Sequence, residues 1–436
     1  MAQFMGTTYA EVAVAAIIPA FLYYAGLFMQ VDSYAARRGL KGLERRELPS
    51  AWQSFKEGWY YAFVIVLLIV MLLYFKRESH APFYATALLL VLNQWAQPGK
   101  WRTVNTLNIA IAVLAAAIMT VRSENYTKAL SASGPGAFDA WTNAILLPAL
   151  GGMLILVVLN ELWGEKRWGL KKYIGFLEAN GRTFVELVGI LAGCGLLIGA
   201  FSLTGVIASL ANDLLSIAGS NVLLLLAMCA LTSLILGLGL TTTACYIFLA
   251  ILVGPALEKL GLNKMAVHMF IFYWGMLSSI TPPVAIASFA AAGIAGAPAM
   301  KTGWESMWVG SIIYFIPFFF VANPALVLQP IDGGGVPYFE AIYLAVTALV
   351  GIVFICGGIQ GYQAGIGDLR RTGALEWPIR LLLVIGGLVL ATPGGGIMPL
   401  SNAQMELLAA ALLVPTVLVA LLMVRRNRPA GDAAAG

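Results

Sequence analysis

Long apolar stretches separated by short polar connectors run along almost the whole chain. A helix needs about 20 mostly apolar residues to span a membrane, and stretches of that length recur here. Runs such as YAFVIVLLIVMLLYF, residues 61–75, do not alternate between apolar and polar positions, which excludes the strands of a membrane β-barrel. The pattern predicts an all-α polytopic membrane protein with about 11–12 membrane segments. The predicted segments are 9–30, 57–75, 81–95, 103–121, 141–162, 184–209, 222–258, 265–297, 305–328, 338–361, 379–398 and 404–424.

Two of these segments carry a break near their centre. Segment 222–258 is interrupted by GLGLTTT, residues 237–243, and segment 265–297 by SSITPPVA, residues 278–285. Glycines permit unusual dihedrals, and consecutive prolines remove backbone donors, so the first half of the second segment should end near Ile280. Because lipid offers no hydrogen bonds, unwound backbone at this depth must be buried in protein or line a polar cavity.

The breaks offer hydroxyl and carbonyl oxygens instead of ionisable groups. Such neutral oxygens suit a desolvated Na⁺, and the N-terminus of a half-helix suits a substrate carboxylate. The alternative is that the glycines and prolines are merely kinks, but two breaks in consecutive segments favour transport. The candidate residues for substrate or cation binding are Gly237, Gly239, Thr241, Thr242, Thr243, Ser278, Ser279, Thr281, Pro282 and Pro283. Among them, the candidate Na⁺ ligands are Gly237, Gly239, Thr242, Ser279 and Thr281, with H⁺ as the alternative coupling ion.

The composition agrees with a membrane protein, and the cations indicate its orientation. Hydrophobic residues make up 60% of the chain and charged residues 11%, and the net charge of +5 arises from connectors, so nothing indicates nucleic-acid binding. The basic connectors 37–56, 166–182, 370–380 and 425–428 are all predicted to be cytoplasmic, and with them the C-terminus. Connectors on the same side must be separated by an even number of membrane crossings. This number is even throughout only if exactly one of the two broken segments is a re-entrant hairpin and the other crosses the membrane.

The connectors divide the chain into five parts. Residues 1–162 are predicted to form scaffold and spacer spans, 163–183 an amphipathic helix in the cytoplasmic interface, and 184–328 the region around the breaks. Residues 329–424 are predicted to be C-terminal spans, and 425–436 a disordered cytoplasmic tail. An ordinary basic loop is the alternative for 163–183, and residues 122–140 are expected to form a polar outer loop.

An intramembrane enzyme is disfavoured, so we predict no catalytic residues and no cofactor. The chain has two histidines, His80 and His268, and no HExxH motif, while Asp213 and Asp368 both fall in connectors. His268 lacks a nearby carboxylate in the sequence, which favours a structural hydrogen bond over a proton relay. The four cysteines show no metal-ligand spacing and are predicted to be small buried residues.

The residues of the two breaks resemble a known family. The region of about residues 237–326 looks like the second half of the large permease subunit of tripartite ATP-independent periplasmic (TRAP) transporters. The resemblance is carried by the runs GLGLTTTACYIFLAILVGPALEKLG, HMFIFYWGMLSSITPPVAIASFAAAGIAG and GWESMWVGSIIYFIPFFFVANPAL. The TAXI-type fused permease is the nearest match, and residues 1–50 are also similar to that subunit.

The resemblance implies a secondary transporter of the bacterial inner membrane that uses a cation gradient, usually Na⁺. It implies two inverted repeats that move as an elevator against a scaffold, with solute supplied by a TAXI-type periplasmic solute-binding protein. It would make 184–328 the second repeat, with 222–258 as its hairpin, GLGLTTT as the hairpin tip, and 265–297 as its broken helix.

The chain departs from the family pattern at two points. The family usually has Pro where Thr241 stands, so the tip is expected to be less rigid. A first repeat with its own hairpin and Pro-Pro break is not found, since ATPGGGIMP, 391–399, lies in the wrong context. We therefore expect the C-terminal portion of a permease, with the first repeat on the same full-length chain or on a separate one. The expected solute is a small organic acid, and the alternative is a non-transporting scaffold or a channel.

Overall fold

The computed structural model forms two compact units. It describes residues 1–427 apart from 41, 43–46, 49, 76–79, 96–102, 132–136, 164–168, 206–208, 210, 211, 214, 215, 220, 239–241 and 331–334. The first unit consists of Met1–Thr7, Glu11–Gly42 and Val188–Gly436, and the second of Thr8–Ala10 and Leu43–Leu187. Both units contain candidate membrane helices.

The second unit is built around the helix α9. The close approach of α9 to α7 depends on Gly152, because a Cβ there would lie 2.9 Å from the Ala116 Cβ and 3.0 Å from the Ala112 carbonyl oxygen. α9 also packs against α6 and α8. The helices are α4 (Ala51–Gly58), η1 (Trp59–Tyr61), α5 (Ala62–Ile69), the π-helical turn η2 (Val70–Tyr74), α6 (Ala81–Trp95), α7 (Thr103–Arg122), α8 (Glu124–Ser131), α9 (Ala137–Trp163) and the first part of α10 (Gly169–Thr204).

The first unit contains both predicted breaks. Its N-terminal helices are α1 (Ala2–Met5), α2 (Tyr9–Ala15), which starts in the other unit, and α3 (Ile17–Arg38). Around the breaks lie α12 (Val222–Gly237), α13 (Thr242–Leu252), α14 (Gly254–Lys259), α15 (Lys264–Met276), η3 (Leu277–Ser279), α16 (Ile286–Ala295), α17 (Ala299–Val309), η4 (Ser311–Tyr314), α18 (Ile316–Ala322) and η5 (Pro324–Val327). The C-terminal part holds α19 (Tyr338–Gln360), β1 (Tyr362–Gln363), β2 (Gly367–Asp368), η6 (Leu369–Leu375), α20 (Glu376–Ala391) and α21 (Asn402–Arg426).

The helices confirm an all-helical polytopic membrane protein. Among the described residues, five helices are long and apolar enough to cross a membrane, or up to eight if each bent pair counts as one span. The five include Tyr9–Arg38, Tyr338–Gln360 and Asn402–Arg426, which contain three of the predicted spans. Shorter apolar helices lie on both sides of the first break and after the second. The antiparallel pair β1–β2 is the sole sheet in the part of the chain that the structure describes.

Three segments differ from the expectation. Residues 124–131 of the expected outer loop form the helix α8. α10 runs without interruption from Gly169 to Thr204, so no break separates the predicted interfacial segment from the predicted span that follows it. The predicted single span 305–328 is instead bent by 63° between Ala299–Val309 and Ser311–Ala322, with Gly310 at the bend.

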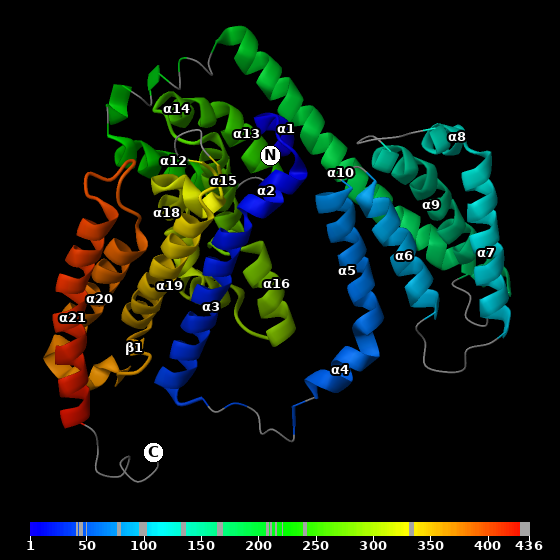
Figure 1. Cartoon of the computed structure of the whole chain (residues 1–436). Helices are drawn as coiled ribbons and strands as arrows, with labels where there is room; N and C mark the ends of the chain where they lie inside the picture. The colour runs from blue at the N-terminus through cyan, green and yellow to red at the C-terminus, as the bar shows by residue number, and fades with distance from the viewer. Residues whose placement is uncertain are drawn as a thin grey trace. The chain divides into compact units, whose positions relative to one another are not determined.

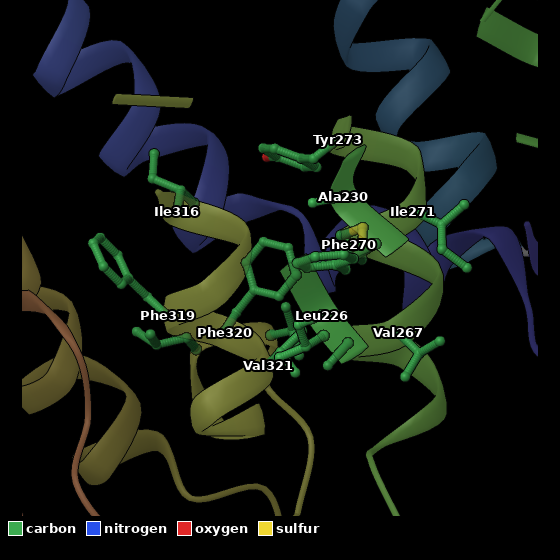
Figure 2. Packing of buried hydrophobic residues seen from close by; sticks show 14 of the residues in the cluster. Leu226, Ala230, Val267, Phe270, Ile271, Tyr273, Ile316, Phe319, Phe320 and Val321 are labelled. Atoms are coloured by element: carbon green, nitrogen blue, oxygen red, sulfur yellow. The ribbon is translucent and has the colours of Figure 1, made fainter. Parts of the chain in front are cut away.

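The core of the first unit lies between α12, α15 and α18 (Figure 2). Phe270 of α15 is fully buried, and its ring meets the Phe318 ring of α18 edge-on at 5.3 Å between centroids. Tyr273 of α15 likewise meets Phe320 edge-on at 5.6 Å. Offset and edge-on aromatic pairs fix the relative orientation of the helices that carry them. The core therefore holds α15, which carries one side of the second break, against α18.

A second group of helices, α3, α19, α20 and α21, stands side by side (Figure 1). Small residues allow the crossing of α19 and α20, since a Cβ at Gly387 would lie 2.6 Å from the Gly351 carbonyl oxygen. Arg380 of α20 is buried and donates to the carbonyl oxygens of Gly358 and Ile359, at 2.8 Å and 2.6 Å. It also pairs with Glu376 at 3.0 Å. The guanidinium thus satisfies carbonyls at the C-terminal end of α19, which have no partner within their own helix.

We expect Phe270→Ala to lower the free energy of unfolding by about 3–5 kcal/mol, because it leaves a cavity between α15 and α18. Ile294→Ala is the matched control, since the Ile294 side chain is 91% exposed and its loss should change stability by less than about 0.5 kcal/mol. Denaturation in mixed detergent micelles, followed by circular dichroism, measures both. Equal losses in the two variants would contradict the packing described.

Candidate functional site

The first predicted break lies between α12 and α13. α12 ends at Gly237 and α13 begins at Thr242, so the helix is interrupted where the Gly and Thr content predicts it. Gly239 and Thr241, which are also candidate site residues, lie outside the described residues. α12 and α13 contact each other, and both pack against α15. The two arms of the break therefore share one supporting helix.

The second predicted break separates α15 from α16. The α-helix ends at Met276 and continues as a 3₁₀ turn to Ser279, close to the expected end near Ile280. The consecutive prolines that follow cannot donate backbone hydrogen bonds, which explains the interruption. Ala285, directly before α16, has φ 32° and ψ 46°, a left-handed conformation that costs a non-glycine residue about 1–3 kcal/mol. The chain therefore re-enters a helix through a strained residue.

The two breaks meet at two glycines. A Cβ at Gly237 would lie 2.9 Å from the Gly275 carbonyl oxygen and 3.1 Å from the Ser278 Cβ. A Cβ at Gly275 would lie 3.1 Å from the Cys245 Sγ, and this thiol lies 3.7 Å from the Ser233 carbonyl oxygen, to which it can donate. The missing side chain at Gly237 therefore lets the end of α12 touch the backbone of α15, and the missing side chain at Gly275 lets Cys245 of α13 pack against α15.

Hydroxyl groups satisfy the carbonyls at the end of α15. Ser278 Oγ donates to the Gly275 carbonyl oxygen at 2.9 Å, and Thr281 Oγ1 donates to the Leu277 carbonyl oxygen at 2.7 Å. Both side chains are buried. Each hydroxyl uses its proton in this bond and keeps oxygen lone pairs as acceptors. The end of the helix therefore presents neutral oxygens, the ligand type that the sequence predicts for a cation.

The other candidate residues are more accessible. Thr242, Ser279 and Pro282 are half-buried, whereas Thr243 and Pro283 are exposed. The close approach at Gly237 is to Gly275 and Ser278. The structure thus brings Gly237, at the end of α12, onto the end of α15 and leaves Thr243 on the surface.

Sequence reasoning missed Tyr314, which closes the second break from the other side. Its hydroxyl lies 2.9 Å from Thr281 Oγ1, and its ring meets Trp274 edge-on at 5.7 Å. The sequence analysis did not include Tyr314, which lies in the aromatic run YFIPFFF, among the candidate site residues. Gly310, at the bend before η4, allows this approach, since a Cβ there would lie 3.0 Å from the Ile280 Cδ1.

Two further hydroxyls near the breaks were also missed. Ser233, one turn before Gly237, and Ser288, in the first turn of α16, are both buried. Their Oγ atoms have no hydrogen-bond partner among the described residues. A buried polar atom without a partner calls for an explanation such as a bound water or ion. A Ser four residues before a break-point Gly is the signal in the sequence that could have found Ser233.

The predicted structural hydrogen bond of His268 is present. Its Nδ1 lies 2.8 Å from the Tyr246 hydroxyl, and its Nε2 lies 3.4 Å from Glu258 Oε1. The Glu258 carboxylate, ten positions earlier in the sequence, was not anticipated as its neighbour. The imidazole therefore ties α13, α14 and α15 together. No group of three or more His, Cys, Asp and Glu side chains that could hold a metal occurs within the described ranges.

We expect Gly237→Ala to destabilise the protein by about 1–3 kcal/mol, because the added methyl group overpacks the contact with Gly275. Gly293→Ala in α16 is the matched control, since a Cβ there has open space, and it should stabilise by up to about 1 kcal/mol through helix propensity. Thermal unfolding of the two purified variants should thus shift in opposite directions. A shift in the same direction would show that the two breaks do not touch at Gly237.

Comparison with known proteins assigns the chain to a family. A scan against protein families matches the description "Tripartite ATP-independent periplasmic transporter, DctM component" over residues 1–124 and 136–331. The match ends at residue 331, just after the run 237–326 that carries the resemblance in the sequence. Neither the curated proteins nor the solved structures give a match. The chain belongs to the DctM family of TRAP transporters, the large permease subunits of ion-coupled secondary transporters of the inner membrane that work with a periplasmic solute-binding protein and are not enzymes.

Proposed function

We propose that this permease imports a small organic carboxylate together with Na⁺, and that substrate and cation bind at residues 237–243 and 278–284. The observation that carries the proposal is the contact of two interrupted helices at Gly237 and Gly275, which gathers backbone and hydroxyl oxygens at one place. Unwound backbone in an apolar medium is stable where it is buried in protein or lines a polar cavity.

The ends of the half-helices would provide complementary sites. The N-terminus of α13 at Thr242 is the positive end of the helix dipole, which favours a substrate carboxylate. The C-terminal end of α15, with Ser278, Ser279 and Thr281, presents oxygen atoms and the negative dipole end, which favour a cation. The unpartnered hydroxyls of Ser233 and Ser288 extend the set of neutral oxygens from which the cation could draw ligands.

Na⁺ is favoured over H⁺ because the contacts at the breaks involve neutral oxygens. A proton carrier needs a titratable group at the site that alternates between its charge states. The buried His268 lies against Tyr246 and Glu258, whereas the break contacts run through Gly237, Gly275 and Ser278. We therefore assign His268 to the support of α13 and α15, not to coupling.

The orientation follows from where the basic connectors meet. Arg370 donates to the Arg37 carbonyl oxygen at 2.9 Å, and Asn427 donates to the Arg371 carbonyl oxygen at 2.6 Å. The connectors after α3, before α20 and after α21 therefore lie at one end of the first unit. We propose that this end is cytoplasmic, in keeping with the excess of Lys and Arg in cytoplasmic loops.

We further propose that the partner is a TAXI-type binding protein. We also propose that a first inverted repeat completes the site and the elevator, and that this repeat lies on a longer form of this chain or on a separate chain. The long run 237–326 supports the TAXI assignment. The competing interpretation is a channel or a non-transporting scaffold. Solute accumulation against its gradient, driven by an inward cation gradient in proteoliposomes with the binding protein present, would separate a carrier from both.

We expect Thr242→Ala and Ser279→Ala to raise the cation concentration needed for half-maximal uptake by about tenfold each, because a bond to a charged ligand is worth about 1.5–3 kcal/mol. Thr347→Ala, which removes a hydroxyl from α19 away from the breaks, should leave it unchanged. Uptake of labelled solute as a function of Na⁺ concentration measures the effect. Unchanged cation dependence in both site variants would refute the assignment.

A further inference from the structure

A cavity of about 780 Å³ lies within the first unit, at the end where the basic connectors meet. Its walls come from the C-terminal end of α3, from α17 and from the C-terminal end of α19. The volume falls within the range of about 300–1,000 Å³ that is typical of small-molecule sites. None of the residues around it belongs to either break, so this cavity is separate from the proposed transport site.

One face of α17 forms the first wall. Lys301, Trp304, Glu305 and Trp308 follow one another at helical spacing and all line the cavity. The two indoles are 60% and 49% exposed. Tryptophan and lysine side chains concentrate where a membrane meets water, because each combines an apolar body with a polar tip. This face therefore has the composition of a surface at the level of lipid headgroups.

The end of α3 forms the opposite wall with Tyr34, Arg37 and Arg38. The Arg38 guanidinium lies over the Tyr34 ring, 4.4 Å from its centroid. Arg37 donates from Nη1 to the Gln360 carbonyl oxygen at 2.8 Å, and this bond anchors it at the end of α19. Both guanidinium groups are thus held in place by neutral partners.

The fourth cation of the lining, Arg370, has a carboxylate partner. Arg370 Nε and Nη2 donate to Asp368 at distances from 2.6 to 3.1 Å. Burial alone raises the pKa of Asp368, but the hydrogen bonds and charge of Arg370, with the charge of Arg37, outweigh it and hold the pKa below its usual value. Asp368 is therefore ionised at neutral pH and balances Arg370.

The lining carries more positive than negative charge. Arg37, Arg38 and Lys301 form no ion pair within the described residues, and the cavity has one acidic residue, Glu305. The remaining excess of cations favours the binding of an anion from outside the chain. Arginine forks match the geometry of phosphate oxygens, and basic pockets between membrane helices are suited to acidic lipid headgroups.

We propose that this cavity binds the phosphodiester of an acidic phospholipid, with Arg37, Arg38 and Lys301 at the phosphate and Trp304 and Trp308 against the glycerol and the upper acyl chain. The bound lipid would join α3 to α17. Helix α17 packs on the second break through Gly303, where a Cβ would lie 2.8 Å from Pro282 Cγ. The site is thereby placed to couple the lipid composition of the membrane to the geometry of that break.

The test uses the purified full chain in detergent, titrated with short-chain phosphatidylglycerol and followed by native mass spectrometry. Removal of one cation near a lipid surface should weaken binding about fivefold, so Arg38→Gln with Lys301→Gln should weaken it about 25-fold. The matched control, Arg425→Gln with Arg426→Gln, removes two exposed cations of α21 outside the cavity and should change binding less than about twofold. Short-chain phosphatidylcholine should bind no more tightly to the wild type than to the double variant.

Three outcomes would overturn the proposal. The first is equal weakening in the cavity variant and the α21 variant, which would indicate attraction by overall charge. The second is displacement of the lipid by glycerol 3-phosphate or inorganic phosphate at equal affinity, which would make this a site for a soluble anion. The third is no preference for phosphatidylglycerol over phosphatidylcholine. If the double variant fails to fold by circular dichroism, Arg38→Gln and Lys301→Gln are measured singly, each with the fivefold expectation.

Discussion

The backbone contact between Gly237 and Gly275 is the constraint around which the first unit is arranged. Two helices can end next to each other in an apolar medium only if their unpaired carbonyl groups find partners. Ser278 and Thr281 supply the partners at the end of α15, and the absence of a side chain at Gly237 lets α12 reach that end. The core between α12, α15 and α18 then fixes the approach, because Phe270 and Tyr273 lock α15 against α18. A larger residue at Gly237 would separate α12 from the end of α15, and one at Gly275 would push Cys245 of α13 away.

The breaks could be predicted from the sequence because their causes are local. Glycine and proline act on their own dihedrals and on those of adjacent residues, so GLGLTTT and SSITPPVA marked the ends of α12 and α15 within a few positions. The partners of the breaks could not be predicted in this way. Tyr314 reaches Thr281 across 33 positions, and the neighbours of Gly275 come from a different helix. The bend at Gly310 was missed for the same reason, since a glycine in an apolar run reads as an ordinary part of a span until the contact with Ile280 is known.

A second set of polar contacts stabilises the opposite type of element, the long uninterrupted helices. Arg380 binds the carbonyls of Gly358 and Ile359, and Arg37 binds that of Gln360, so two cations cover the negative end of the α19 dipole. Removing a buried cation of this kind would leave several carbonyls and Glu376 without partners, which makes its position hard to change. Arg37 and Arg380 both belong to connectors that charge alone predicts to be cytoplasmic, and the Arg37 carbonyl oxygen also accepts a hydrogen bond from Arg370. Their charges therefore serve both topology and helix ends.

The two kinds of helix end differ in the way that transport requires. At the end of α19 the carbonyls are neutralised by fixed guanidinium groups, which leaves no attraction for a cation from solution. At the end of α15 the carbonyls are bound by hydroxyls, which carry no charge and keep oxygen lone pairs free. The negative dipole end of α15 therefore remains available to a Na⁺ ion, while that of α19 does not. On the strength of this difference in capping groups, we propose the end of α15 as the cation site and assign the end of α19, equally rich in carbonyl oxygens, to the frame.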